Sequence, residues 1–207
     1  MVVGITGSIG SGKSSLAHLL AQRGAVLVDA DRLGHQVLEE PEVCAALVRV
    51  FGANIADAQG RVVRRELGKL AFASQEGFEQ LNGIVRPFLE KRLWEEIARA
   101  QAGAQDPLVI VDAALIFEWG VAERFDLIVV VDAPLDLRRR RAAARQGLSP
   151  EEVEKRMAWQ LPAEEKAARA DVVVHNAGAL GELEAAAEKV WEGLRNWQGR
   201  RDRGYES

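Results

Sequence analysis

Cysteine and histidine are scarce in this chain, and their scarcity excludes several kinds of site. The single cysteine, Cys44, cannot form an internal disulfide bond, which favours a protein of the reducing cytoplasm. The three histidines show no metal-ligand spacing with Cys44, so we assign them no metal site.

Long apolar runs and an excess of positive charge are also missing. The longest apolar runs, such as 127–131, have the length of a β-strand and are too short to cross a membrane. The formal net charge of −4 argues against nucleic acid as the main partner. Because the first expected strand starts at residue 2, we expect no signal peptide before it. These absences favour a globular cytoplasmic protein without membrane or nucleic-acid partners. We expect it to act as a monomer or small homo-oligomer.

A phosphate-binding signature stands at the start of the chain. A short apolar run leads directly into residues 7–14, whose sequence GSIGSGKS matches G-x-x-x-x-G-K-S. Glycines in such a loop let successive N–H groups turn inward on a phosphate. Lys13 can reach the β- and γ-phosphates, and the Ser14 hydroxyl is placed to ligate Mg²⁺. A helical pattern follows, so we predict a nucleoside triphosphate site. Its expected residues are Gly10, Ser11, Gly12, Lys13, Ser14 and Ser15.

A second apolar run, 25–28, is followed by two carboxylates, Asp29 and Asp31. In open α/β sheets, ligands bind at the carboxyl ends of the parallel strands. One carboxylate could take a proton from an attacking hydroxyl while the other holds Mg²⁺ through water. The alternative is that Asp29 caps the helix that the spacing of Leu33 and Val37 predicts.

No strand pattern appears between residue 32 and about residue 105. Helices are expected near 42–51, 64–73, 75–85 and 87–102, with Pro87 in the first turn of the last one. We interpret this stretch as an all-helical lobe inserted between the second and third strands, where a second substrate would bind. Four arginines there could bind phosphate or could simply be solvated: Arg61, Arg64, Arg65 and Arg86.

Three more strands are expected, near 107–112, 126–132 and 170–176, with a final helix over 180–197. Asp112 ends the first of them as a Walker-B-like carboxylate would, and could hold the Mg²⁺ shell; a turn or helix-cap residue is the alternative. Asn176 ends the last one, where an adenine could contact it, although turn chemistry alone would also explain it. The fold class is therefore α/β, a three-layer P-loop NTPase core with a five-stranded parallel sheet, an inserted helical lobe and a helical lid.

The lid is predicted from an arginine-rich helix and the capping box that follows it. Five arginines lie at 138–141 and 145, and Arg138, Arg141 and Arg145 share one helical face, which favours an anionic ligand. A nucleic-acid patch is the alternative, but the chain lacks aromatic interleaving and an overall basic charge. Ser149 and Glu152 form the capping box of a second short helix. Arg141, Arg145 and Arg156 could neutralise a transferring phosphoryl group.

Taken in order, these motifs resemble those of the dephospho-coenzyme A kinase family. Residues 4–14 match the family's G-x-T-G-x-I-G-S-G-K-S, and residues 29–31 match its D-A-D. Shorter matches run along nearly the whole chain, at 51–52, 59–60, 64–67, 81–82, 86–87, 114–118, 141 with 145, 156 with 160, 170–171 and 176–178. At residue 59 glutamine replaces the family's aspartate. Three further departures bear on the acceptor site: Arg86 replaces histidine, Ala114 replaces proline and Arg138 replaces glutamine.

The resemblance implies an enzyme that transfers the γ-phosphate of ATP to the ribose 3′-hydroxyl of dephospho-CoA, giving CoA and ADP, with Mg²⁺ as cofactor. It implies that Asp31 is the base, with Asp29 nearby at the acceptor. Arg64 would help to bind dephospho-CoA, and we also assign Arg86, which stands at the position of the family histidine, to substrate binding. Arg141 and Arg145 would serve the nucleotide and the transition state, and Asn176 would lie near the adenine. Together with Asp31, we expect Lys13 and Arg145 to be the catalytic residues.

The expected division of the chain follows from these assignments. The nucleotide-binding core comprises 1–32, 107–136 and 166–197, the CoA-binding lobe 33–106, the lid 137–165 and a flexible tail 198–207. Another metabolite kinase of the P-loop group would share the core and lid but differ in the lobe. A GTPase switch is disfavoured, because neither D-x-x-G after the third strand nor N-K-x-D occurs.

Overall fold

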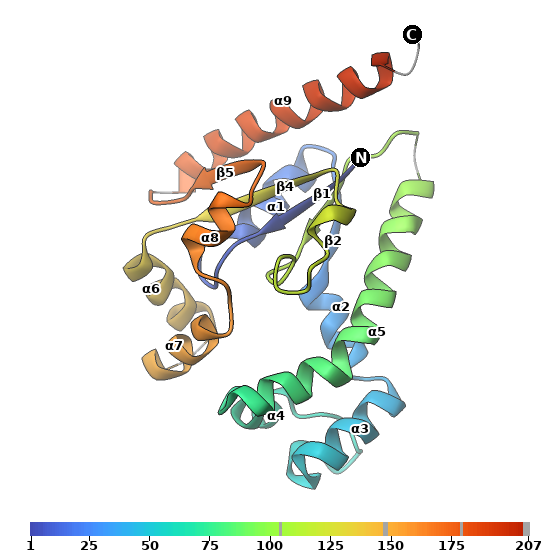
Figure 1. Ribbon diagram of the computed structural model, residues 1–207, viewed down its shortest axis with the longest axis vertical. Coiled ribbons are helices and arrows are strands. Elements are labelled where there is room, and N and C mark those ends of the chain that lie inside the picture. The colour runs from blue at the N-terminus through green and yellow to red at the C-terminus, as the bar shows by residue number, and fades with distance from the viewer. Residues whose placement is uncertain (104, 147–148, 179, 205–207) are drawn as a thin grey trace.

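The chain forms one five-stranded sheet with helices on both of its faces (Figure 1), in a computed structural model that describes residues 1–103, 105–146, 149–178 and 180–204. All four strand pairings are parallel, and the strand order is β2-β3-β1-β4-β5. This arrangement confirms the predicted fold class. The strands are β1 (Val2–Thr6), β2 (Val26–Asp29), β3 (Val109–Asp112), β4 (Leu127–Asp132) and β5 (Val172–His175).

The central strands are buried on both faces, which explains why their sequences are apolar without alternation. Successive side chains point to opposite faces of a strand. In β3, Val109 and Val111 therefore belong to one core, whereas Ile110 belongs to the other. The sheet thus separates two apolar cores, and its carboxyl edge lies between them.

Helices α1 (Lys13–Gln22) and α9 (Leu180–Gly204) cover one face of the sheet, and α2 (Ala30–Val37) and α5 (Gln75–Ala102) pack on the other. The lobe adds α3 (Pro41–Phe51), the short 3₁₀ helix η1 (Ala53–Ile55) and α4 (Arg64–Ala71) at the bottom of Figure 1. The apolar core of the lobe is continuous with that of the adjoining sheet face. The lobe is therefore packed against the sheet rather than tethered to it.

The predicted break at Pro87 is wrong. A single helix, α5, continues through it. Proline in a helix interior removes one hydrogen bond, and its ring crowds the carbonyl four residues earlier. Buried Leu89, Leu93 and Ile97 hold the second half of α5 against the core, and this packing outweighs the local cost.

The segment predicted to form a lid folds as α6 (Leu135–Gln146) and α7 (Pro150–Ala158), and the short α8 (Ala163–Ala168) leads back to the sheet. Ser149 Oγ accepts a hydrogen bond from Glu152 N, and the Glu152 carboxylate accepts one from Ser149 N, which confirms the capping box. A second 3₁₀ helix, η2 (Ala122–Arg124), precedes β4.

Helix α9 continues to Gly204, through most of the residues expected to form a flexible tail. Gln198 is buried, and its Nε2 donates to the carbonyl oxygen of Asp106, 3.0 Å away. Residues 205–207 lie outside the described residues. None of the helices in the described part of the chain has the length and apolar content needed to span a bilayer.

Candidate active site

The loop of residues 7–12 lies between β1 and α1, at the carboxyl edge of the central strand. Gly10 and Gly12 have φ angles of 77° and 97°, a region that favours glycine. A Cβ at Gly10 would come within 2.2 Å of the Arg138 carbonyl oxygen, and one at Gly12 within 2.2 Å of Asn176 Nδ2. Both glycines are therefore required by backbone conformation and by the close approach of neighbouring segments.

Lys13 and Asp112 form an ion pair at this edge, because β3 lies directly beside β1. Lys13 Nζ lies 3.3 Å from Asp112 Oδ1, and the Asp112 side chain is only 4% exposed. Lys13 Nζ also lies 3.4 Å from Ser14 Oγ. Three residues predicted for the nucleotide and the metal are thus brought together.

The surroundings of Asp112 fit a magnesium ion. Asp112 Oδ1 is buried, and the Lys13 ammonium 3.3 Å away forms an ion pair with it without the geometry of a hydrogen bond. The described residues contain no group of three or more His, Cys, Asp or Glu that could hold a metal by itself. Mg²⁺ commonly takes only one or two protein oxygens and fills its remaining positions with water and phosphate. The pair of Asp112 and Ser14 is such a partial set.

Asp29 and Asp31 have different surroundings. Asp29 ends β2 opposite Asp112 in the strand register, and its Oδ1 accepts a hydrogen bond of 3.0 Å from Arg32 N. It therefore caps α2, as the alternative interpretation held. Asp31, in the first turn of α2, is exposed and has no hydrogen bond or ion pair with a described residue.

Asn176 supports the phosphate loop rather than offering a free amide. Its Nδ2 donates to the carbonyl oxygen of Ser11 at 2.7 Å, and the residue is buried. Arg141 Nη1 in turn donates to the Asn176 carbonyl oxygen at 3.1 Å. Arg141 and Asn176 thus connect α6, the end of β5 and the loop.

The arginines of α6 do not form one exposed basic face. Arg138 is buried and donates to the carbonyl oxygen of Ala133, and Arg139 pairs with Glu154 of α7. Arg145 belongs to α6, but its side chain lies outside what the structure describes.

The two arginines assigned to acceptor binding differ in their contacts with the rest of the protein. Arg64 begins α4, is exposed and has no ion pair with a described residue. Arg86 binds Glu90 through Nε, and its Nη2 donates to the Trp119 carbonyl oxygen at 2.6 Å. Arg86 therefore joins α5 to the segment after β3.

Sequence reasoning missed a buried lysine beside the site. Lys166 is fully buried, and its Nζ lies 2.8 Å from both Glu118 Oε1 and the Ala114 carbonyl oxygen. Burial lowers the pKa of Lys166; the Glu118 carboxylate opposes the shift, and the positive charge of Lys13 adds to it. The surrounding A-E-E-K-A-A is typical of a solvated helix, so the sequence carries no signal of this role.

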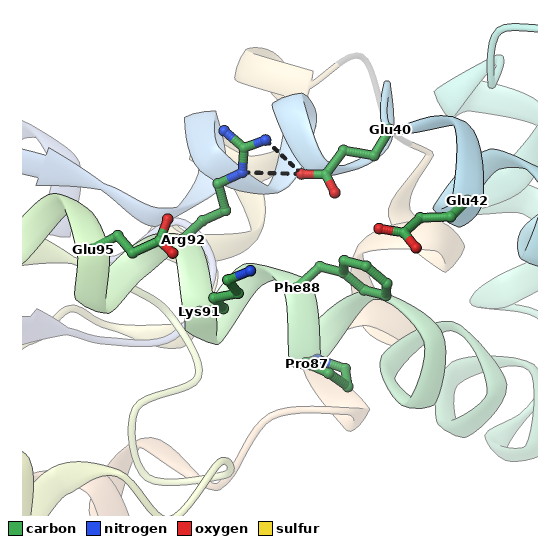
Figure 2. Close-up of a pocket in the computed structure, with 7 residues that line it drawn as sticks. All are labelled: Glu40, Glu42, Pro87, Phe88, Lys91, Arg92 and Glu95. Atoms are coloured by element: carbon green, nitrogen blue, oxygen red, sulfur yellow. Dashed lines mark hydrogen bonds and ion pairs between the residues drawn. The ribbon is translucent and has the colours of Figure 1, made fainter.

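A cavity of about 520 Å³ opens elsewhere, between the start of α3 and the middle of α5 (Figure 2). Three glutamates, two cations, Pro87 and Phe88 line it, and Arg92 pairs with Glu40 at 2.8 Å. None of its lining residues was predicted for the site, and its mixed charges do not specify one ligand.

Comparison with known proteins agrees with the geometry. The model of the dephospho-CoA kinase family matches residues 1–182. The dephospho-CoA kinase of Anaeromyxobacter dehalogenans is 41% identical over 201 residues, covering 97% of this chain and 95% of that protein. The crystal structure of TT1252 from Thermus thermophilus is 40% identical, with a TM-score of 0.75 and coverage of 94% and 97%.

The structure of dephospho-CoA kinase from Campylobacter jejuni is also similar in fold, with a TM-score of 0.69 at 23% identity, covering 93% of this chain and 96% of that one. The family model and the curated relative both extend over the P-loop, the lobe and the lid. The chain therefore belongs to the dephospho-CoA kinase family, the ATP-dependent transferases that phosphorylate dephospho-CoA in the last step of coenzyme A biosynthesis.

Proposed function

We propose that phosphoryl transfer takes place at the carboxyl edge of β1, β2 and β3, with Asp31 as the base that accepts the proton of the ribose 3′-hydroxyl. The observation that supports this most is the contrast between two neighbouring carboxylates. Asp29 is engaged in the cap of α2, whereas Asp31 is exposed and unpaired among the described residues. A base must reach a substrate proton, so the exposed carboxylate is suited to that role.

The nucleotide side of the reaction is assigned to the phosphate loop. Its backbone N–H groups and the N-terminus of α1 bind the phosphates of ATP, and the Lys13 ammonium neutralises charge at the β- and γ-phosphates. The Asp112 carboxylate holds that ammonium at the mouth of the loop. Arg141 acts through Asn176, whose amide holds the Ser11 carbonyl oxygen.

Ser14 and Asp112 would hold Mg²⁺ through the Ser14 hydroxyl and the buried Asp112 carboxylate, beside the Lys13 ammonium. When bound, the ion would neutralise the negative charge that develops on the phosphate groups.

The acceptor side is assigned to the helical lobe. The exposed Arg64 guanidinium, which has no ion pair with a described residue, supplies a positive charge for dephospho-CoA. Arg86 has a structural part in the acceptor site, because it joins α5 to Trp119. Arg145 would meet the transferring phosphoryl group from the lid, where a guanidinium stabilises transition-state charge.

The setting we propose is the cytoplasm, because Cys44 is a free thiol and a reducing compartment preserves it. We propose a monomer or small homo-oligomer that acts on a small molecule and not on nucleic acid, in keeping with the net charge of −4.

The experiment that tests the function measures ADP release with Mg²⁺ and ATP across a panel of acceptors. Dephospho-CoA, nucleosides, nucleoside monophosphates, shikimate and gluconate are compared, and the product is identified by mass. We expect strong turnover with dephospho-CoA alone and CoA as its product. Turnover with another acceptor and none with dephospho-CoA would contradict the assignment of the lobe.

A further inference from the structure

The turn between α7 and α8 contacts three parts of the molecule through three consecutive residues. The Trp159 ring stacks on Phe78 of α5, with centroids 5.2 Å apart and planes 17° from parallel. Gln160 Oε1 accepts a hydrogen bond from Ile9 N at 2.8 Å. Leu161 N donates to Glu118 Oε1 at 2.9 Å. The turn therefore connects the lobe, the phosphate loop and the segment after β3.

The contact with the phosphate loop fixes its backbone. Ile9 lies in the middle of the G-x-x-x-x-G-K-S sequence, directly before Gly10 in its left-handed conformation. An N–H that donates to Gln160 is held away from the phosphates, so the neighbouring N–H groups keep one arrangement. Gln160 is half-buried, which shields this hydrogen bond from competing water.

The contact with the lobe is aromatic. Phe78 also lies 5.9 Å from Phe72, and the Arg156 guanidinium of α7 lies 5.0 Å from the Phe72 ring. Phe72 directly follows α4, the helix that begins with Arg64. The end of the lid helix α7 thus rests on the α4–α5 corner of the lobe.

The third contact is a fixed anchor. Glu118 Oε1, which accepts from Leu161 N, is also paired with fully buried Lys166 at 2.8 Å. Lys166 Nζ and Thr6 Oγ1 both donate to the Ala114 carbonyl oxygen. The α8 end of the turn is therefore held by buried charge, whereas its α7 end is held by two half-buried side chains.

We infer that Trp159 and Gln160 are positioning residues that couple the two substrate sites, so that acceptor binding at the lobe favours ATP binding at the phosphate loop and the reverse. The two contacts are satisfied together only when the turn holds one position between lobe and loop. A substrate that orders either the lobe or the phosphate loop favours that position of the turn. Coupling of this kind is reciprocal: each substrate changes the affinity for the other by the same factor. The inference rests on the proposed binding of dephospho-CoA at the lobe.

The first test measures the binding of a non-hydrolysable ATP analogue by calorimetry, with and without saturating dephospho-CoA. Gln160→Met keeps the length of the side chain but removes the acceptor. We expect the factor by which one substrate tightens the other to fall at least about fivefold, with affinities for either substrate alone within about threefold of wild type. A factor equal to that of wild type would overturn the inference.

The second test needs no acceptor and follows hydrogen exchange of the Ile9 amide in the free protein. Trp159→Leu removes only the lobe contact, and it should still speed Ile9 exchange about fivefold, as Gln160→Met does directly. If Ile9 exchanged at the wild-type rate in Trp159→Leu, the turn would not couple the lobe to the phosphate loop.

Two matched controls distinguish a loss of coupling through the turn from a general loss of protein stability. Gln198→Ala removes another hydrogen bond between a glutamine side chain and a distant backbone group, in this case the Asp106 carbonyl oxygen that accepts from Gln198 Nε2, and Trp94→Leu removes another half-buried indole. Both should leave the coupling factor and Ile9 exchange unchanged; a change as large as in Gln160→Met would contradict the inference. A wild-type protein that does not bind dephospho-CoA would contradict the proposed function instead, because the exchange test is independent of it.

Discussion

Asp29 and Asp31 stand two positions apart, and the surroundings of each side chain separate their roles. Asp29 accepts a backbone hydrogen bond at the start of α2, a task that asparagine performs equally well. Asp31 makes no such bond, so its charge is available to a substrate. Substitution with the isosteric amide therefore distinguishes a base from a cap.

We predict that Asp31→Asn lowers kcat by about 10²–10⁴-fold, the usual contribution of a general base, while the Kd of ATP stays within about twofold. Steady-state kinetics and calorimetry measure the two quantities. Asp29→Asn is the matched control for stability: it should keep the free energy of unfolding, whereas Asp29→Ala should lower it by about 1 kcal/mol. Near-wild-type kcat in Asp31→Asn would remove Asp31 from the proton transfer.

Lys166 is the residue whose removal should harm the fold most directly. We predict that Lys166→Met lowers the free energy of unfolding by about 3–5 kcal/mol in urea, because it leaves the Glu118 carboxylate without its buried partner. The double variant Lys166→Met/Glu118→Gln should recover most of that loss, since the amide oxygen can still accept from Leu161 N. Additive losses in the double variant would show that the two side chains do not interact.

At the scale of elements, the strands and the phosphate loop could be predicted, and the ends of the helices less well. Continuous apolar runs mark buried parallel strands, and a glycine-rich loop before a helix marks a phosphate site. The continuation of α5 through Pro87 and of α9 to Gly204 depends on tertiary contacts. Buried Leu89 and Gln198 supply them, and neither contact is visible in a local pattern.

The candidate site was predicted in its residue types but not in its contacts. Asp112 lies beside Lys13 only because β3 enters the sheet between β1 and β2, an order that the sequence does not reveal. The contacts of Arg86 with Trp119 and of Asn176 with Ser11 were missed for the same reason, since each joins segments far apart in the chain. Long-range contacts, rather than local propensity, determine where these side chains lie and what they contact.

Helix α7 begins with a capping box whose strength depends on pH. Hydrogen bonds from Ser149 lower the pKa of Glu152 below its ordinary value of 4.5. A carboxyl group with a lowered pKa stabilises the folded state above that ordinary value, and the stabilisation is lost as pH falls through the folded pKa. The start of the lid helix should therefore loosen in acid.

We predict that Glu152→Ala speeds hydrogen exchange in the first turn of α7 at pH 7, and that its difference from wild type disappears well below pH 4.5, after correction for intrinsic exchange rates. Glu151→Ala is the matched control, because Glu151 is exposed in the same turn and is not part of the capping box. Equal effects of the two substitutions would attribute the change to helix charge alone.

At the scale of the whole molecule, one sheet separates two apolar cores and carries the site on its edge. One core continues from the sheet into the lobe through α2 and α5, and the other is closed by α1 and α9. Loss of packing in the lobe is therefore transmitted to the strands that position Asp29 and Asp112.

The strand order also bears on how the chain is made. The first two strands to leave the ribosome, β1 and β2, do not pair with each other; β3 lies between them, and β1 pairs on its other side with β4. No ladder of the sheet can close before Val109 has been synthesised, and the phosphate loop has no complete support before β4 ends at Asp132. Until then the nascent chain can form only local helices. The apolar first strand therefore stays unpaired until more than half of the protein has been translated.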